Sequence, residues 1–312
     1  MAGRYQQTLA RAVRIEGTGL HSAAGVRLKL LPAGADSGII FERTDAAGVE
    51  IPASHAFLRS SRYATTLARD GVEVSTVEHL LSALSGLGVD NARIEIDGPE
   101  VPILDGSALP FVRAIRSAGL RRLGTPRRRL SLLRPISVRM GGKEILALPA
   151  NEFEATYAID FPHPAIGYQA VTTRITEERY ADSIAAARTF CLLSEVEAMR
   201  RSGLARGGSL SNALVVGEVG VMNGTLRYRD EFVRHKVLDL IGDLALLGAP
   251  LRAHVIVFKG GHELHAALIA RILRERSAWS LAASDRRLTP SQIARFAQIS
   301  DRLVPRGVAL TA

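Results

Sequence analysis

The chain has 312 residues, 47% of them hydrophobic, so it is long enough for two domains that each bury a core. Its net charge of +9 and pI near 10.3 favour contact with an anion: a nucleotide, an anionic membrane surface or a nucleic acid. Aromatic residues make up only 5% and do not interleave with the arginines, which disfavours a base-stacking surface for nucleic acid.

Cysteine usage and apolar runs bear on the compartment. The single cysteine, Cys191, cannot form an internal disulfide, which is compatible with a reducing compartment. The most apolar stretch, residues 238–251, contains Asp239 and Asp243, so no transmembrane helix is predicted. The first residues lack an apolar core of signal-peptide length. These features together predict a cytoplasmic protein.

The first part of the chain reads as short strands interrupted by a helix. Alternating or β-rich residues predict strands at 26–31, 38–41 and 92–96. Ser75 and Glu78 are the two ends of a capping-box pattern, which predicts a helix that ends near Gly86. A second helix is expected at 109–117 and is closed by Gly119.

An arginine-rich segment, residues 121–135, follows these elements and contains Gly124 and two prolines. It predicts a solvated linker, with attraction of an anionic surface as the alternative. We therefore expect an N-terminal α+β domain at 1–125, a C-terminal α+β domain at 126–276 and a C-terminal extension at 277–312.

The second part repeats the order of strands followed by helices. Strands are predicted at 136–140, 145–148, 153–159 and 253–258. A helix is expected from Glu263 onward, and a short amphipathic helix at 290–303. The repeated order predicts an α+β fold built from a duplicated unit.

A polar stripe within an apolar helix is the strongest chemical signal. His235, Asp239 and Asp243 follow one another at intervals of four, so they line one face of a helix that Asp230 begins and Gly248 ends. Buried carboxylates need a bound ion or a hydrogen-bonded network. One nitrogen and one oxygen donor suit zinc, although an ordinary pair on a helix face would give the same spacing.

Two further motifs could complete such a site. His79 could be a third ligand, or a satisfied core histidine, and Glu78 beside it could act in catalysis or only cap its helix. His262 follows two glycines at the end of a predicted strand, which suits either a catalytic acid or a simple turn. His265, three residues later, is expected to be a surface or packing residue.

Four segments, in this order, together resemble the UDP-3-O-acyl-N-acetylglucosamine deacetylase family: STVEHLLSALSGLGVDNARIEIDGPEVPILDGSALPFV, ARTF, DEFVRHKVLDLIGDLALLG and KGGH. The resemblance runs from about Gln6 to about Trp279. It implies two related α+β domains, each a sheet packed against helices, with the active site between the helix layers. It also implies deacetylation in lipid A synthesis of Gram-negative bacteria.

The resemblance assigns roles to matching positions. His79, His235 and Asp239 would hold one Zn²⁺ per chain, and Glu78 would take the proton of a water molecule. His262, oriented by Asp243, would stabilise the oxyanion or protonate the departing amine. The hydroxyl of Thr189, in ARTF, would donate a hydrogen bond to the oxyanion.

Substrate contacts are also implied. Uracil would meet Asp160 and Phe161, with Phe190 nearby, and the diphosphate and sugar would meet Lys143, Lys236 and Lys259. An inserted βαβ unit would form an apolar tunnel for the acyl chain, lined by Leu192, Val196, Met199, Ala213 and Val215. Cys191 stands where the family has a glycine.

Two other functions fit part of the pattern. Another zinc-dependent amide or ester hydrolase would share the metal ligands but lack the nucleotide pocket and the tunnel. A non-catalytic basic protein would bind an anion through its surface charge, with histidines that only pack. We expect UDP-3-O-acyl-N-acetylglucosamine as substrate, no nucleic acid, weak contact with an anionic membrane surface and no obligate protein partner.

Overall fold

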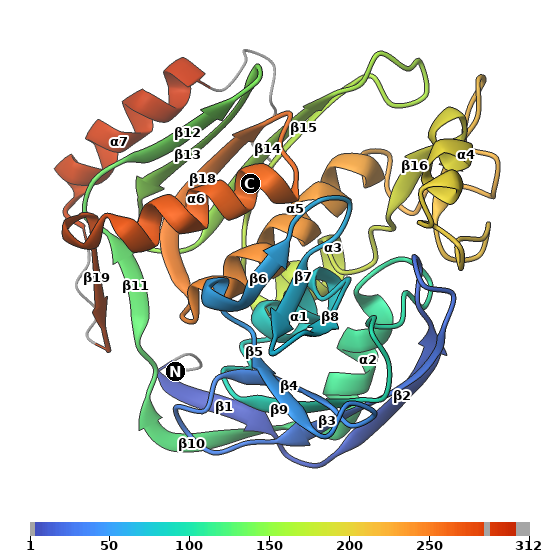
Figure 1. The fold of residues 1–312 in the computed structure, drawn as a ribbon. Helices are drawn as coiled ribbons and strands as arrows, with labels where there is room; N and C mark the ends of the chain where they lie inside the picture. The colour runs from blue at the N-terminus through green and yellow to red at the C-terminus, as the bar shows by residue number, and fades with distance from the viewer. Residues whose placement is uncertain (1–3, 284–287, 304–312) are drawn as a thin grey trace.

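Two β-sheets, each packed against helices, form the computed structural model, which describes residues 4–283 and 288–303 (Figure 1). The first sheet has the strand order β2-β3-β9-β4-β5, with bounds Val13–Thr18, Gly25–Pro32, Ala92–Ile96, Ile39–Arg43 and Val49–Pro52. Its helices are α1 (Glu78–Gly86) and α2 (Leu109–Ala118). Leu30 and Ile94 of the sheet and Leu80 of α1 are fully buried in one core.

The second sheet is larger. Its main path is β12 (Ile136–Met140), β13 (Lys143–Pro149), β18 (Leu251–Phe258), β11 (Arg129–Leu132) and β19 (Trp279–Ala282). Strand β18 also pairs with β14 (Glu154–Asp160), which pairs with β15 (Tyr168–Arg174). Its helices are α3 (Glu177–Ser183), α5 (Glu231–Leu244), α6 (His262–Arg274) and α7 (Pro290–Leu303). In the described part of the chain, no helix is long and apolar enough to cross a bilayer.

The two halves share one topology. The ladder β2-β3-β9-β4-β5 is antiparallel, antiparallel, parallel and antiparallel, and the ladder β12-β13-β18-β14-β15 has the same sequence of directions. In chain order α1 lies between β5 and β9, as α5 lies between β15 and β18. The predicted α+β fold with two related units is therefore confirmed, and α1 and α5 are equivalent helices.

Each half carries an insert before its equivalent helix. The first half has a small sheet, β6-β7-β8, with bounds Leu58–Ser60, Thr66–Arg69 and Val72–Val74, preceded by a short 3-10 helix, η1 (His55–Phe57). The second half has two parallel strands joined by a helix: β16 (Phe190–Leu192), α4 (Leu193–Arg201) and β17 (Leu214–Val216). This is the βαβ unit that the resemblance implied.

The first part of the arginine-rich segment is largely exposed, as predicted, but the segment forms paired strands, so the prediction of a linker without regular structure is wrong. The segment forms β10 (Leu120–Pro126), which pairs with β1 (Tyr5–Leu9), and β11, which lies between β18 and β19 in the second sheet. Leu130 and Leu132 alternate with arginine and serine, so a strand buries the leucines and leaves the charged groups outside. We propose that the chain passes between its two domains near residue 127; β19 belongs to the second sheet.

The remaining 3-10 helices, η2 (Ala245–Leu247) and η3 (Arg276–Ala278), follow α5 and α6. Gly248 adopts the left-handed conformation directly after η2 and ends this helical stretch, as the sequence predicted. The helix predicted at 109–117 is α2, which ends at Gly119 with φ of 70°.

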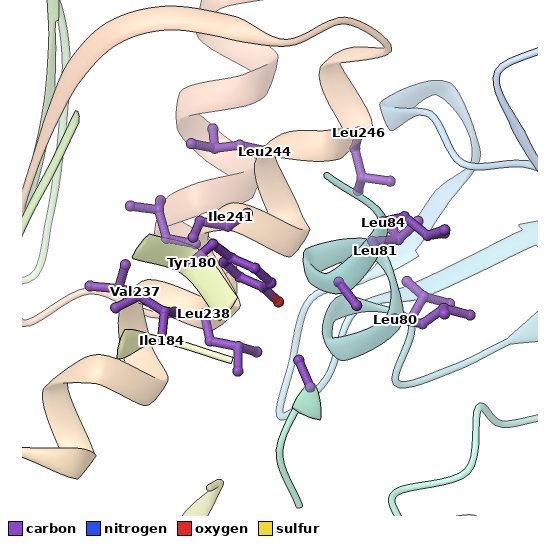
Figure 2. Close-up of a cluster of buried hydrophobic side chains, with 14 of the residues drawn as sticks. Leu80, Leu81, Leu84, Tyr180, Ile184, Val237, Leu238, Ile241, Leu244 and Leu246 are labelled. Atoms are coloured by element: carbon purple, nitrogen blue, oxygen red, sulfur yellow. The ribbon is translucent and has the colours of Figure 1, made fainter. Parts of the chain in front are cut away.

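The two equivalent helices, α1 and α5, pack directly against each other. Figure 2 shows α1 and α5 side by side, with Tyr180 of α3 reaching in between them next to Ile241. Leu80 of α1 points to the other side, toward the strands of the first sheet. The buried core that includes these residues also contains Leu81, Leu84, Val237 and Leu238. The closest approach is at Gly242, where a Cβ atom would overlap the Glu78 carbonyl oxygen and lie 2.8 Å from its carbon. Only glycine permits this separation of the helices.

Replacing Gly242 with alanine is therefore expected to lower the free energy of unfolding. Alanine would favour the helix by about 1 kcal/mol, but overpacking against a backbone costs about 1–3 kcal/mol. Urea unfolding should show a net loss of up to about 2 kcal/mol, centred on about 1 kcal/mol.

Gly25→Ala on β3 is the matched control, because its methyl group would meet nothing within 4 Å. Its effect should stay within about 0.5 kcal/mol. An unchanged or raised stability of Gly242→Ala would show that the helices separate freely.

Candidate active site and metal centre

The first turn of α1 and the middle of α5 bring together three side chains that could bind a metal ion. His79, His235 and Asp239 each offer one ligand atom, and these atoms all lie within 4.8 Å of one another. The Asp239 Oδ1 atom is 3.7 Å from His79 Nε2 and 3.3 Å from His235 Nε2. All three side chains are buried.

The hydrogen bonds around this cluster prepare it for a cation. His235 Nδ1 lies 3.1 Å from the Ala187 carbonyl oxygen, so Nδ1 carries the proton and Nε2 presents a lone pair toward Asp239. Within the described residues, Asp239 Oδ1 is buried and has no hydrogen-bond donor. His235 Nε2 and Asp239 Oδ1 therefore face each other in the interior with no proton between them. A metal ion bound to both atoms would compensate for their burial.

The charge states also suit a metal. Burial lowers the pKa of His235 to about 3, which keeps the imidazole neutral. Burial alone would raise the pKa of Asp239, but the positive charge of Lys236 beside it holds that pKa well below its usual range. Lys236 Nζ donates to Asp239 Oδ2 over 2.9 Å. The residues present therefore fit a divalent metal.

Glu78 lies beside the cluster, at the first residue of α1. Its Oε2 accepts a hydrogen bond of 3.0 Å from the Thr65 backbone N–H, and burial raises its pKa. The predicted capping box is wrong. Thr76 has φ of 56°, so the chain turns sharply before the helix, and Ser75 bonds to Thr66 instead of to α1. The Glu78 carboxylate is thus free for chemistry.

His262 begins α6 and faces the same site. Its Nδ1 lies 2.7 Å from Asp243 Oδ2, and its Nε2 lies 3.9 Å from both Glu78 Oε1 and Asp239 Oδ2. Burial lowers the pKa of His262, but Asp243, Asp239 and Glu78 overcome this and raise it to about 10. Burial raises the pKa of Asp243, and His262 and His265 bring it down to about 2.

Three residues that surround Asp243 were not predicted from the sequence to belong to the site. His265, predicted as a surface or packing residue, is fully buried, and its Nδ1 lies 2.7 Å from Asp243 Oδ2. Thr65 Oγ1 donates to Asp243 Oδ1 over 2.6 Å, and the Tyr157 hydroxyl lies 3.1 Å from His265 Nε2. The sequence did contain one signal for His265: it lies three residues after His262, so the two side chains are neighbours on the same apolar face of a helix.

A cavity of about 640 Å³ opens from this cluster into the βαβ insert. Thr189 and Phe190 line it near the metal-binding residues, and its wall toward the insert includes Cys191, Val196, Met199, Ala213 and Val215. Leu192 packs against the main core instead. Most of the residues expected to hold an acyl chain therefore share one cavity with Glu78 and His262.

A turn from the first half fixes the position of Thr189. Gly106 has φ of 83°, and a Cβ atom there would overlap the Asn212 carbonyl group. The Gly106 carbonyl accepts a hydrogen bond of 2.8 Å from the Thr189 N–H. Arg227 pairs with Asp105 over 2.9 Å. The turn therefore joins the first half to both ends of the insert.

Of the residues expected to hold the nucleotide, Phe190 and Lys236 line the cavity, whereas Lys143, Asp160, Phe161 and Lys259 are not among its lining residues. Phe161 packs edge-on against Phe190, with ring centroids 5.6 Å apart, and Lys236 Nζ lies 5.5 Å from the Phe190 ring centroid. Lys259 pairs with Asp160 over 2.8 Å. Lys143 lines an adjacent hollow that includes Arg62, Tyr63 and His262. The hollow and the cavity share Tyr63 and His262 among their lining residues.

Two related α+β halves around a buried His, His and Asp cluster, with a glutamate and a histidine beside it, define a metal-dependent hydrolase. Residues 6–274 match the sequence profile of UDP-3-O-acyl N-acetylglycosamine deacetylase, and the chain belongs to this family.

Relatives named UDP-3-O-acyl-N-acetylglucosamine deacetylase are similar over most of their length. The protein of Myxococcus xanthus is 46% identical over 284 residues, covering 90% of each chain. That of Solibacter usitatus is 47% identical over 283 residues, covering 90% of this chain and 96% of its own. That of Syntrophotalea carbinolica is 44% identical over 282 residues, with coverage of 90% and 91%.

Removal of either imidazole should abolish tight metal binding. His79→Ala and His235→Ala are each expected to reduce the bound metal from about one ion per chain to near zero, because two protein ligands do not hold such a site. Elemental analysis after gel filtration measures this. His163→Ala is the control, since His163 Nδ1 accepts a hydrogen bond only from Ala165 in its own loop. Full metal content in both ligand variants would refute the assignment.

Proposed function

We propose that this chain hydrolyses the N-acetyl group of UDP-3-O-acyl-N-acetylglucosamine with one bound zinc ion, releases acetate, and so serves lipid A biosynthesis. The observation that carries the proposal is the placement of Glu78 and His262 beside the His79, His235 and Asp239 cluster, at the inner end of an apolar cavity. We also propose that the reaction takes place in the cytoplasm.

Zinc is the metal favoured by the donor set. Two neutral imidazole nitrogens and one carboxylate oxygen are typical of catalytic zinc sites, which keep one position open. When bound, zinc would lower the pKa of a water molecule and polarise the amide carbonyl. The protein groups around it must then move protons and hold charge.

Glu78 would accept the proton of the attacking water. Its Oε2 is held by the Thr65 N–H, which fixes the carboxylate and leaves Oε1 turned toward His262 Nε2. Burial raises the pKa of Glu78 and makes its carboxylate a stronger base than an exposed one. The position and the basicity both suit a general base.

His262 would supply the positive charge and the proton that amide cleavage requires. Asp243 accepts from Nδ1, so the second N–H of the imidazolium, at Nε2, faces the space between Glu78 and Asp239. There it would stabilise the oxyanion and protonate the departing amine. The Thr189 hydroxyl lines the same cavity and would donate to the oxyanion.

The substrate class rests on the cavity and its rim. The apolar wall from Val196, Met199, Ala213 and Val215 suits an acyl chain, which would be shielded from water. Phe161 and Phe190 offer ring faces and edges for a base, and nearby lysines suit a diphosphate. Another zinc amide hydrolase would not require this combination.

The net charge of +9 supports weak contact with an anionic membrane surface.

Glu78→Gln should separate catalysis from metal binding. The amide keeps the size of the side chain and its acceptor for the Thr65 N–H, but it cannot take a proton, so kcat should fall about 10²–10⁴-fold. Metal content should stay at about one ion per chain. Acetate release from the UDP substrate measures the first quantity and elemental analysis the second. Unchanged turnover in this variant would rule out Glu78 as the base.

Val215→Phe should shorten the space for the acyl chain. KM for a substrate with a long acyl chain should rise about 10-fold or more, while a short-chain substrate should be affected far less. Val219→Phe is the control, because Val219 belongs to the same insert but is 95% exposed. Equal effects on both chain lengths would show that the acyl chain binds elsewhere.

A further inference from the structure

A chain of four hydrogen-bonded side chains extends from His262 into the core of the second half. His262 Nδ1 and His265 Nδ1 each lie 2.7 Å from the same atom, Asp243 Oδ2. His265 Nε2 then lies 3.1 Å from the hydroxyl of Tyr157, on β14. Asp243, His265 and Tyr157 are buried.

The direction of these hydrogen bonds follows from the donor inventory. A carboxylate oxygen can only accept, so Nδ1 of His265 must carry a proton to approach Asp243 this closely. A doubly protonated His265 would place a second buried cation beside His262, and burial lowers the pKa of His265. His265 is therefore neutral with a bare Nε2, and the Tyr157 hydroxyl donates to it.

Both carboxylate oxygens of Asp243 then accept hydrogen bonds from the protein. Thr65 Oγ1 donates to Oδ1 over 2.6 Å, and the two imidazoles donate to Oδ2. The carboxylate is fixed in orientation from both sides and cannot rotate away from His262. Loss of the His265 donor would free Oδ2 to move, and the ring of His262 would lose its fixed plane.

We propose that Tyr157 and His265 are positioning residues for the deacetylation: Tyr157 selects the Nδ1-protonated form of His265, and His265 fixes the Asp243 carboxylate that aims His262. This inference rests on the proposed function. Neither residue touches the cavity, since His265 and Tyr157 are not among its lining side chains. Their effect should therefore fall on turnover and not on substrate binding.

A second metal ion is the competing explanation. Ligand atoms of Asp243, His262 and His265 also lie within 4.8 Å of one another. A metal there would need bare Nδ1 atoms on both imidazoles, whereas both lie at hydrogen-bond distance from one carboxylate oxygen. The hydroxyl of Tyr157 at Nε2 also stabilises the protonated Nδ1, because it donates to the other nitrogen.

The kinetic test uses the zinc-loaded full chain and a UDP-3-O-acyl-N-acetylglucosamine. Tyr157→Phe should lower kcat about 10-fold and His265→Ala about 100-fold, with KM changed less than about twofold. His265→Asn places an amide N–H near the position of Nδ1, so it should recover kcat to within about 10-fold of the wild type. A purely structural role predicts no such recovery.

Tyr180→Phe is the matched control. Tyr180 is also fully buried, and its hydroxyl makes one hydrogen bond of 3.0 Å, to Ser82, at the contact of α1 with α3. The two tyrosine variants remove the same atom from similar surroundings. Equal kcat values in Tyr157→Phe and Tyr180→Phe would overturn the inference, as would two metal ions in the wild type that fall to one in His265→Ala.

Nitrogen-15 NMR of the histidine rings reads the tautomer without any turnover. We expect His265 in the zinc-loaded protein to show a protonated Nδ1 and a bare Nε2, and Tyr157→Phe to shift this signal toward a mixture of tautomers. A protonated Nε2 in the wild type would overturn the inference. If the wild type bound zinc and showed the expected tautomer but released no acetate, the proposed function would fail while the hydrogen-bond direction stood.

Discussion

The contact of α1 with α5 at Gly242 is the constraint on which the site depends. Glu78 and His79 come from α1, whereas His235, Asp239 and Asp243 come from α5, so neither half of the chain holds a metal alone. The buried apolar side chains of the two helices, such as Leu80 and Leu238, each contribute about 1.5–3 kcal/mol on burial. That packing offsets the cost of burying carboxylates, several kcal/mol for each unpaired ion.

The buried charges stabilise one another only as a set. Asp239 and Asp243 are ionised, and their attraction raises the pKa of His262 to about 10 despite burial. Lys236 reaches Asp239 from the partly exposed side and adds a second cation. A metal ion held by His79, His235 and Asp239 would add the positive charge that Asp239 Oδ1, without a donor, still lacks. The low-dielectric surroundings strengthen these interactions, which suits a site that must hold a developing negative charge.

The sequence predicts what local spacing determines. Intervals of four place His235, Asp239 and Asp243 on one stripe, and the structure brings them together with Glu78, His79 and His262. The role of His265 could not be predicted, because its partners come from β14 and α5, and only the tertiary fold makes it buried. The capping-box prediction was wrong for a similar reason. The left-handed conformation of Thr76 turns the chain before the helix, and this conformation cannot be recognised from the residue pattern. The prediction of a linker at residues 121–135 was based on charge composition. It overlooked the alternation of Leu130 and Leu132 with polar residues, which is typical of a strand.

The duplication places both inserts beside the proposed active site. Both inserts enter at the same topological position, directly before α1 in one half and before α5 in the other, so both lie next to the metal cluster. The first insert supplies Thr65, whose backbone N–H donates to Glu78 and whose hydroxyl donates to Asp243, and it thereby links the proposed base to the hydrogen-bond partner of His262. The second supplies the apolar wall of the cavity. The repeated frame thus fixes the distance between the two helices. Changes within the inserts can then alter the shape of the cavity without moving the proposed metal ligands on α1 and α5.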